Sequence, residues 1–184
     1  MSKKVKIMMI LLLILIAIGV ILFFSLKNSG EQEIIEYTPQ QEISDEQLRQ
    51  TFVSLYFKNK ETGEIMPEGR VMDAKMLLNN PYEQLLNMLI EGPKNTQLEN
   101  SIPMGTKLNK VELKSGTVWI DFSKEFIQNH PGGKEEEQKT ISCLVNTLTE
   151  LTEVNSIRIV IEGKEDQGFA DNGINFKENF IRQK

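Results

Sequence analysis

The residues that could carry acid–base chemistry stand close together in the second half of the chain. Asp121 and Glu125 lie four positions apart, with Ser123 between them. Two carboxylates so placed can act as a general acid and a general base. The competing interpretation is structural, with Asp121 capping the turn after a strand and Glu125 solvated. We expect the structural interpretation, because the three polar residues alternate where that strand ends.

Two further residues could form a nucleophile with its base, or a metal site. His130 is the only histidine and Cys143 the only cysteine among the 184 residues. A zinc site needs more ligands than these two, and a Cys–His pair would require the two side chains to meet. The helical phase of its segment places Cys143 away from the apolar stripe. The chain also lacks the G-x-S-x-G, H-E-x-x-H and phosphate-loop motifs, so we expect no catalytic residue, metal or cofactor.

Two aromatic side chains, Trp119 and Tyr56, are candidates for contact with a partner. Trp119 lies on the strand face opposite Val118 and Ile120, which places it toward a face that the helices leave open. Exposed aromatic residues often anchor protein partners. The alternative is that the C-terminal tail or the first strand covers Trp119. Burial of Trp119 within the monomer would remove the reason for assigning it to a partner.

The stretch around Trp119 predicts a β-hairpin that leads into a central strand. Val118, Ile120 and Phe122 recur with the period of a half-buried strand. The preceding Ser115-Gly116 is a turn signal, since glycine accepts the positive φ of a tight hairpin. Further strands are predicted by alternating apolar residues at 51–57, 70–72, 107–113 and 157–161.

Two segments predict amphipathic helices. Asn80 and Pro81 are typical of a helix start, and Gly92-Pro93 of its end. The second helix begins near Glu135, where acidic residues favour a helix N-terminus. The apolar stripes are Tyr82, Leu85, Leu86 and Leu89 in the first helix and Ile141, Leu144, Val145, Leu148 and Leu151 in the second. The order strand–strand–helix–strand–strand–helix–strand predicts an α+β domain of two layers, with one mixed sheet and both helices on one face.

The first 50 residues predict a membrane anchor and a tether. Residues 1–6 form a basic stub, and residues 7–26 form an apolar segment that spans about 30 Å as a helix. The lysines before it place the N-terminus in the cytoplasm. The alternative is a cleaved signal peptide, whose best site, Ala17-Ile18-Gly19, would leave an apolar new N-terminus. Lipidation is not expected, because a lipoprotein needs a cysteine directly after the apolar segment and the only cysteine is Cys143.

Beyond this segment, residues 27–50 predict an acidic flexible linker, and residues 51–184 a domain outside the cytoplasm. The part of the chain after residue 30 holds 17 basic and 26 acidic residues, a net charge of −9. Such a surface repels nucleic acids and anionic lipid headgroups. We therefore expect no nucleic-acid partner.

The segment Val118-x-Ile120-Asp121-Phe122-Ser123-x-Glu125-Phe126 resembles the core motif of the GerMN domain family of spore germination and sporulation proteins. Three other pieces stand in the family's order, Leu89-x-x-Gly92-Pro93, Ile102-Pro103-x-Gly105-Thr106 and the stretch from Val145 to Glu150. The resemblance covers one copy, from about Phe52 to the C-terminus. It assigns structural positions in the motif to Gly92, Pro93, Asp121, Phe122, Ser123, Glu125, Asn146 and Thr147.

The resemblance implies a role in sporulation or germination of a Gram-positive-type cell. Domains of this kind are similar in fold to ring-building modules of secretion systems and of the channel between mother cell and forespore. A non-catalytic assembly module that binds protein partners, including further copies of itself, is what that similarity implies. With the anchor, the expectation is a single-pass cell-membrane protein with its domain outside.

Two alternatives remain open. The first is a cell-wall accessory module that binds peptidoglycan or regulates an amidase, for which a groove with several exposed aromatic residues would speak. The second is a signalling accessory that binds a sensor protein or a small ligand, for which a closed apolar pocket would speak.

Overall fold

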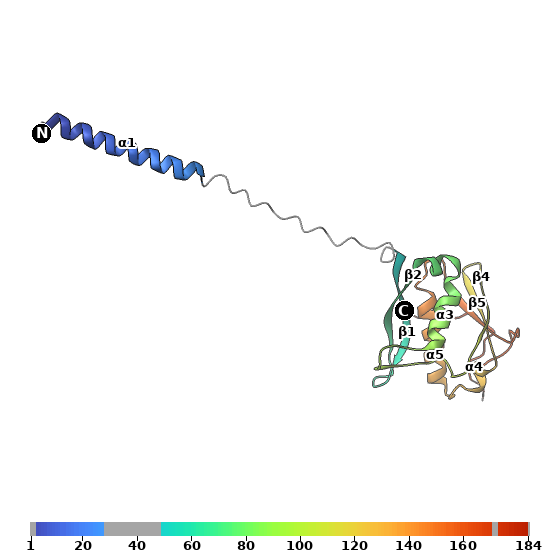
Figure 1. The fold of residues 1–184 in the computed structure, drawn as a ribbon. Coiled ribbons are helices and arrows are strands. Elements are labelled where there is room, and N and C mark those ends of the chain that lie inside the picture. Colours follow the sequence, from blue (N-terminus) through green and yellow to red (C-terminus); the bar gives the residue numbers. More distant parts are fainter. Residues whose placement is uncertain (1–2, 28–48, 171–172, 184) are drawn as a thin grey trace. The chain divides into compact units, whose positions relative to one another are not determined.

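The computed structural model describes residues 3–27, 49–170 and 173–183 and divides into two units, Met1–Glu42 and Ile43–Lys184. In the first unit, helix α1 (Lys3–Lys27) contains the predicted apolar segment and is long and apolar enough to cross a membrane (Figure 1). Of the predicted acidic linker 27–50, residues 28–48 lie outside the described residues. The boundaries of stub, anchor and linker therefore remain predictions.

The described part of the second unit forms two three-stranded sheets. In sheet A, β1 (Gln50–Asn59) pairs antiparallel with β2 (Ile65–Asp73) and with the short β3 (Leu98–Glu99). In sheet B, β5 (Thr117–Phe122) pairs antiparallel with β4 (Leu108–Lys114) and parallel with β6 (Ser156–Ile161). The α+β class is confirmed and sheet B is mixed as predicted, but the expected single sheet is in fact two.

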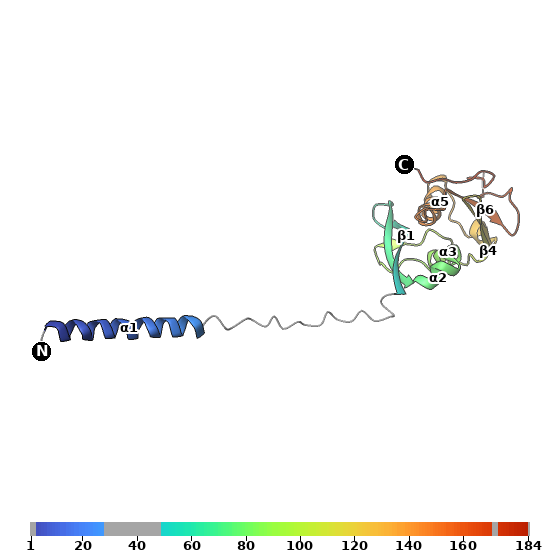
Figure 2. The same ribbon diagram turned by 90° about the horizontal axis from the view of Figure 1, so that it is seen from above.

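Helices α3 (Pro81–Glu91) and α5 (Lys134–Leu148) lie between the two sheets (Figure 2). Helix α3 contacts β1 and β4, and α5 contacts β1 and β6. Both helices thus cover one face of the mixed sheet, as predicted, and sheet A covers their other side. The sequence did not reveal the third layer, because the alternation of Leu55 and Phe57 marks a buried strand face without specifying what buries it.

The third layer explains the burial of Cys143, which the helical phase had placed away from the apolar stripe of its helix. Cys143 is fully buried, as are Thr140 and Thr147 on the same side of α5. The backbone N–H of Tyr56 in β1 donates to the Thr147 hydroxyl over 3.0 Å, so this side of α5 faces sheet A. Cys143 thus lies opposite the apolar stripe, as the helical phase predicted, but it is buried there because sheet A packs on that side of α5.

The turn between β4 and β5 forms where the sequence predicted it. Ser115 and Gly116 have φ values of 50° and 78°, as a tight hairpin requires. A Cβ on Gly116 would lie 2.5 Å from Asn155 Nδ2, so glycine is needed at this position for space as well as for φ.

Several boundaries differ from the predictions. Strand β2 begins at Ile65 and not near Arg70, so it is longer than the strand predicted at 70–72. Asn80 precedes α3, but its side chain donates to Glu83 instead of capping a backbone amide. Two short helices, α2 (Ala74–Asn79) and α4 (Glu125–Gln128), were not predicted. All three differences involve short-range polar contacts or short elements, for which apolar periodicity is a weak signal.

The C-terminal tail packs on the domain, as expected. Phe169 and Phe176 are buried against Phe126, with ring centroids 5.5 and 6.2 Å from it, and Phe126 stacks on Phe122 at 4.6 Å. Phe180 forms an antiparallel bridge with Ile157 of β6. The tail therefore covers the edge of sheet B that β6 forms. The edge at β4 and the outer face of the sheet remain open to other contacts.

Candidate functional site

The outer face of sheet B carries a groove around Trp119. Side chains from all three strands lie there in register, since Trp119 of β5 stands opposite Glu112 of β4 and Arg158 of β6. The groove has a volume of about 230 Å³, and Trp119 is half-buried in it. Its lining residues are Lys110, Glu112, Lys114, Trp119, Asp121, Val160, Gly163 and Glu165.

Two cations lie over the Trp119 ring. Lys114 Nζ is 4.9 Å and Arg158 Cζ 5.5 Å from the ring centroid. Cations in this position are attracted by the negative face of the indole. A cation over the ring leaves less of its face open for stacking on a sugar.

The charges of the groove are paired and close to balance. Glu112 Oε1 lies 2.6 Å from Lys110 Nζ, and Glu112 Oε2 lies 3.0 Å from Lys114 Nζ. These hydrogen bonds hold the pKa of the Glu112 carboxyl below its ordinary value. Arg158 lies 3.6 Å from Glu165, and its buried Nε has no hydrogen-bond partner within the described residues.

The carboxylates Asp121 and Glu125 make separate contacts in the structure. Asp121 Oδ1 accepts from the Gly163 N–H over 3.1 Å and so fixes the turn after β6, not the turn after its own strand. Glu125 lies in the first turn of α4, outside the groove, and a hydrogen bond from Ser123 lowers its pKa. Ser123 Oγ also accepts from the Lys107 N–H over 3.0 Å. Together with buried Phe122, these motif residues shape the exit from β5.

The Gly92-Pro93 motif is held by two charged residues of β2 that the sequence analysis did not single out. Gly92 has a φ of 96° where α3 ends, and its carbonyl accepts from Arg70 Nη2 over 2.8 Å. Glu68 pairs with Arg70 and accepts from the N–H groups of Lys94 and Asn95 over 3.0 and 2.8 Å. The spacing Glu68-x-Arg70, which places both on one strand face, was the available signal.

Burial alone would raise the pKa of the Glu68 carboxyl. The hydrogen bonds from the Asn95 amide, the Arg70 guanidinium and the Lys94 amide outweigh that effect and hold the pKa below its ordinary value. Glu68 is therefore a fixed carboxylate that joins β2 to the loop after α3.

The two predicted partner contacts lie on different sheets. The Tyr56 hydroxyl, on sheet A, donates to Glu150 over 2.8 Å and accepts from Arg182 over 2.8 Å, and Arg182 also lies 5.2 Å from the ring centroid. The fully buried Thr147 accepts the backbone N–H of Tyr56, and its neighbour Asn146 lines a cavity of about 260 Å³ beside the tail. Both rings are half-buried, but the Tyr56 hydroxyl is held by two groups of the chain, whereas Trp119 lines the groove on the outer face of sheet B.

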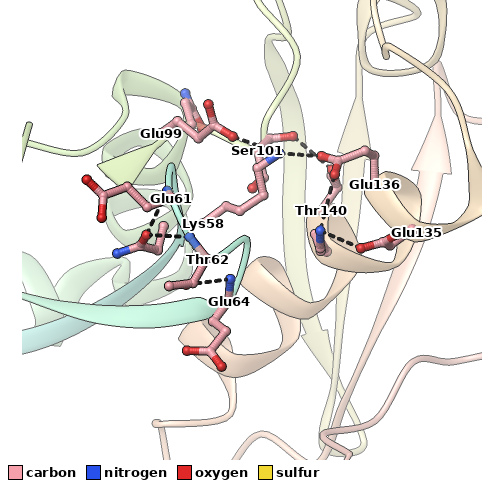
Figure 3. A network of polar contacts seen from close by, with 12 residues as sticks. Lys58, Glu61, Thr62, Glu64, Glu99, Ser101, Glu135, Glu136 and Thr140 are labelled. Carbon is pink, nitrogen blue, oxygen red and sulfur yellow. Dashed lines mark hydrogen bonds and ion pairs between the residues drawn. The ribbon is translucent and has the colours of Figure 1, made fainter. Parts of the chain in front are cut away.

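A larger cavity, of about 570 Å³, lies between β1, the loop at 99–105 and α5. Lys58 Nζ lies there between Glu136 and Glu99, 2.7 Å from Glu99 (Figure 3). Burial alone would lower the pKa of Lys58, but the hydrogen bonds to Glu136 and Glu99 outweigh it and raise the pKa. Periodicity did not reveal this network, because its members come from three elements far apart in the sequence.

His130 and Cys143 both reach the edge of this network without meeting. His130 Nε2 lies 3.0 Å from the Thr140 hydroxyl, which donates to the Ser101 carbonyl over 2.9 Å, whereas the Cys143 thiol bonds the Ser101 hydroxyl over 3.5 Å. Burial raises the pKa of the Cys143 thiol to about 11. The thiol is thus protonated at neutral pH and is not an activated nucleophile.

Within residues 3–27, 49–170 and 173–183, three or more His, Cys, Asp or Glu side chains do not gather in a way that could hold a metal ion. The paired charges around Trp119, the carboxylate of Glu68 and the Lys58 network are bonded to protein groups.

The family model described as "Germane: Sporulation and spore germination" matches residues 54–167. The spore germination protein GerM of Bacillus subtilis (strain 168) is 34% identical over 88 residues, which cover 45% of this chain and 23% of that protein. The match therefore spans about a quarter of the length of this relative.

Three solved structures share the fold. The first GerMN domain of the sporulation protein GerM from Bacillus subtilis has a TM-score of 0.60 at 24% identity, over 73% of this chain and 99% of that one. The tandem GerMN domains of the same protein have a TM-score of 0.60 at 24% identity, over 72% of this chain and 46% of that one. A putative lipoprotein from Clostridium perfringens has a TM-score of 0.50 at 24% identity, over 76% of this chain and 92% of that one. These likenesses confirm the α+β fold that the resemblance implied.

Proposed function

The chain belongs to the Germane family of sporulation and spore germination proteins, and from this premise we propose that it is a non-catalytic assembly module that α1 anchors in the cell membrane. Its N-terminus lies in the cytoplasm and its domain outside. The domain acts through the groove around Trp119, which binds a protein partner. That partner is another protein or a further copy of this chain.

The observation that carries this proposal is the groove itself. Trp119 is half-buried on the outer face of sheet B. The strand β1 belongs to sheet A, and the tail contacts the β6 edge and contributes Glu165 to the groove. A central aromatic side chain with charged residues around it has the composition of a protein-binding hot spot and its rim.

The wall-accessory alternative finds less support. A glycan groove would need several exposed aromatic residues on one surface, but Tyr56 lies on the other sheet, where Glu150 and Arg182 hold its hydroxyl. The small-ligand alternative needs a closed apolar pocket, whereas the cavity of about 570 Å³ is lined mainly by polar and charged side chains such as Lys58, Glu99 and Glu136.

Site-specific crosslinking in sporulating cells tests the proposal. A photoreactive residue is placed at Lys110, on the rim of the groove, in the full-length chain. We expect a covalent product with a protein during sporulation, and loss of that product when Trp119→Ala is added. Recovery of the chain itself would identify self-assembly as the contact.

The same photoreactive residue at Met104, which is 89% exposed and outside the groove, serves as the control position. Peptidoglycan or wall hydrolases captured from growing cells would contradict the proposal in favour of the wall-accessory role. An undiminished product from the Trp119→Ala chain would contradict the assignment of Trp119.

A further inference from the structure

Large apolar side chains are exposed at the end of sheet A where β1 begins. Phe52 of β1 stands opposite Val71 of β2, and they are 79% and 51% exposed. Directly after β2, helix α2 exposes 48% of Met76 and 83% of Leu78. We call these four residues the apolar patch.

The other end of the same sheet face is covered. Tyr56, four residues beyond Phe52, lies under Arg182 and bonds Glu150. Helix α2, in turn, has no buried residue within this described segment, although three of its six residues are Met or Leu. Single exposed apolar residues are ordinary, but their gathering on adjacent elements marks an interaction surface.

The course of the chain indicates which surface this patch meets. Helix α1 ends at Lys27 and β1 begins at Gln50, so 22 residues join them. At about 3.5 Å per residue or less, the start of β1 lies within about 80 Å of the end of α1. Phe52 is the third residue of β1, which places the patch at the end of the domain nearest to the anchor along the chain.

A short tether raises the effective concentration of the domain at the bilayer to the order of mM. A contact that would be too weak for a free protein is then sufficient. The four side chains expose at most a few hundred Å², less than the roughly 800 Å² that each partner contributes to a standard protein interface. Lipid contact needs only a few apolar side chains that enter the interfacial region.

The charges beside the patch also fit a lipid surface. Lys75 is exposed in the first turn of α2. Asp73 is bonded to the Lys75 N–H over 2.8 Å. Basic side chains at the rim of an apolar surface extend toward headgroups. Six of the 26 acids lie in residues 28–48, so residues 49–184 hold 17 basic and 20 acidic residues, and the docking is carried by the apolar side chains.

We propose that the apolar patch docks on the bilayer that holds α1. The domain then rests on the extracytoplasmic surface of that membrane, with Phe52 and Leu78 inserted into its interfacial region. This inference rests on the retained anchor of the proposed function. It concerns a surface separate from the Trp119 groove, which lies on the other sheet.

Spin labelling of the full chain tests the docking. The chain is reconstituted through α1 into phosphatidylcholine vesicles, with and without phosphatidylglycerol, and a nitroxide is attached at Leu78→Cys or at the control Met104→Cys. The native Cys143 is buried with its pKa raised to about 11, so labelling at neutral pH is directed to the introduced cysteine. Both substituted side chains are more than four-fifths exposed, so neither change disturbs the core.

In either lipid composition, we expect the label at 78 to collide more with oxygen than with a water-soluble nickel chelate, and the label at 104 to show the reverse. Adding Phe52→Ser should lower the oxygen collisions at 78. Water-like behaviour at 78 in both compositions would overturn the proposal. Shielding of 78 from both reagents, with spin–spin broadening that grows with protein density, would assign the patch to a second copy and also overturn it.

Failure of the anchor is distinguished by an alkaline carbonate wash before the measurement. A chain that leaves the vesicles would overturn the anchor and the docking together. A chain that stays, with 78 in water, would overturn the docking alone.

Discussion

The polar side chains of sheet A are bonded to other layers of the domain, whereas those on the outer face of sheet B are bonded to one another at the surface. On sheet A, Arg70 is 6% exposed and donates to the Gly92 carbonyl. On sheet B, Lys110, Glu112 and Lys114 share two ion pairs and each exposes more than a third of its side chain. The comparison indicates that buried charged residues such as Arg70 maintain the fold. The ion pairs at the surface of sheet B leave that surface available for binding.

Breaking the Arg70 contacts should have the largest effect. In Arg70→Met, the Glu68 carboxylate remains almost buried without its cation, and the Gly92 carbonyl loses its donor. Removal of one member of a buried ion pair costs about 3–5 kcal/mol of folding free energy. Urea unfolding of the full chain in detergent, followed by circular dichroism, measures the loss.

The matched control on sheet B is Glu112→Gln, which removes an acid that also bonds two partners, but at the surface. Its free energy of unfolding should equal that of the wild type within error. Equal losses in the two variants would contradict the distinction between the sheets.

A smaller loss is expected at the contact between β1 and α5. Thr147→Val keeps the volume of the side chain but removes the acceptor of the Tyr56 N–H. An unpaired donor of this kind costs about 1–3 kcal/mol. The control is Thr149→Val, because the Thr149 hydroxyl donates to the Val145 carbonyl, which also accepts the Thr149 N–H. Stability of Thr147→Val at the level of the control would show that water replaces the hydroxyl.

The smallest effect concerns pH and the loop beside sheet A. Burial lowers the pKa of His130 below its ordinary value of 6.5, although Glu137 and Glu136 oppose the shift. The unfolded chain therefore binds the proton more readily, so stability is complete above about pH 6.5 and falls as the pH drops toward the folded pKa. The geometry agrees, since the Gly132 N–H donates to Nδ1 of the neutral ring.

Unfolding midpoints of the wild type and His130→Gln, measured from about pH 7.5 to about pH 5, check this expectation. The wild type should lose more stability than the variant over that range. A parallel pH dependence of the two chains would assign the acid sensitivity to the carboxylates instead.

The candidate site could be predicted in part from particular residues. Alternation around Trp119 indicated that it faces away from the helices, and the structure places it on the outer face of sheet B. The residues that surround it, Lys114 and Arg158, come from two other strands, and only the register of β4 and β6 brings them over the ring. Tyr56 shows the converse, because its contacts with Glu150 and Arg182 depend on the path of the tail.

The sequence by itself determined the elements and their buried faces. Ser115-Gly116 specifies the hairpin, Pro81 and Gly92 bound α3, and apolar periods identify β5 and α5, because each signal acts within a few residues of the chain. The tertiary structure alone decided that β1 and β2 form a separate sheet, that Cys143 is buried, and that Glu68 and Arg70 hold the Gly92-Pro93 motif. The physical reason is that periodicity states which face of an element avoids water, whereas the layer that covers it depends on packing between segments far apart in sequence.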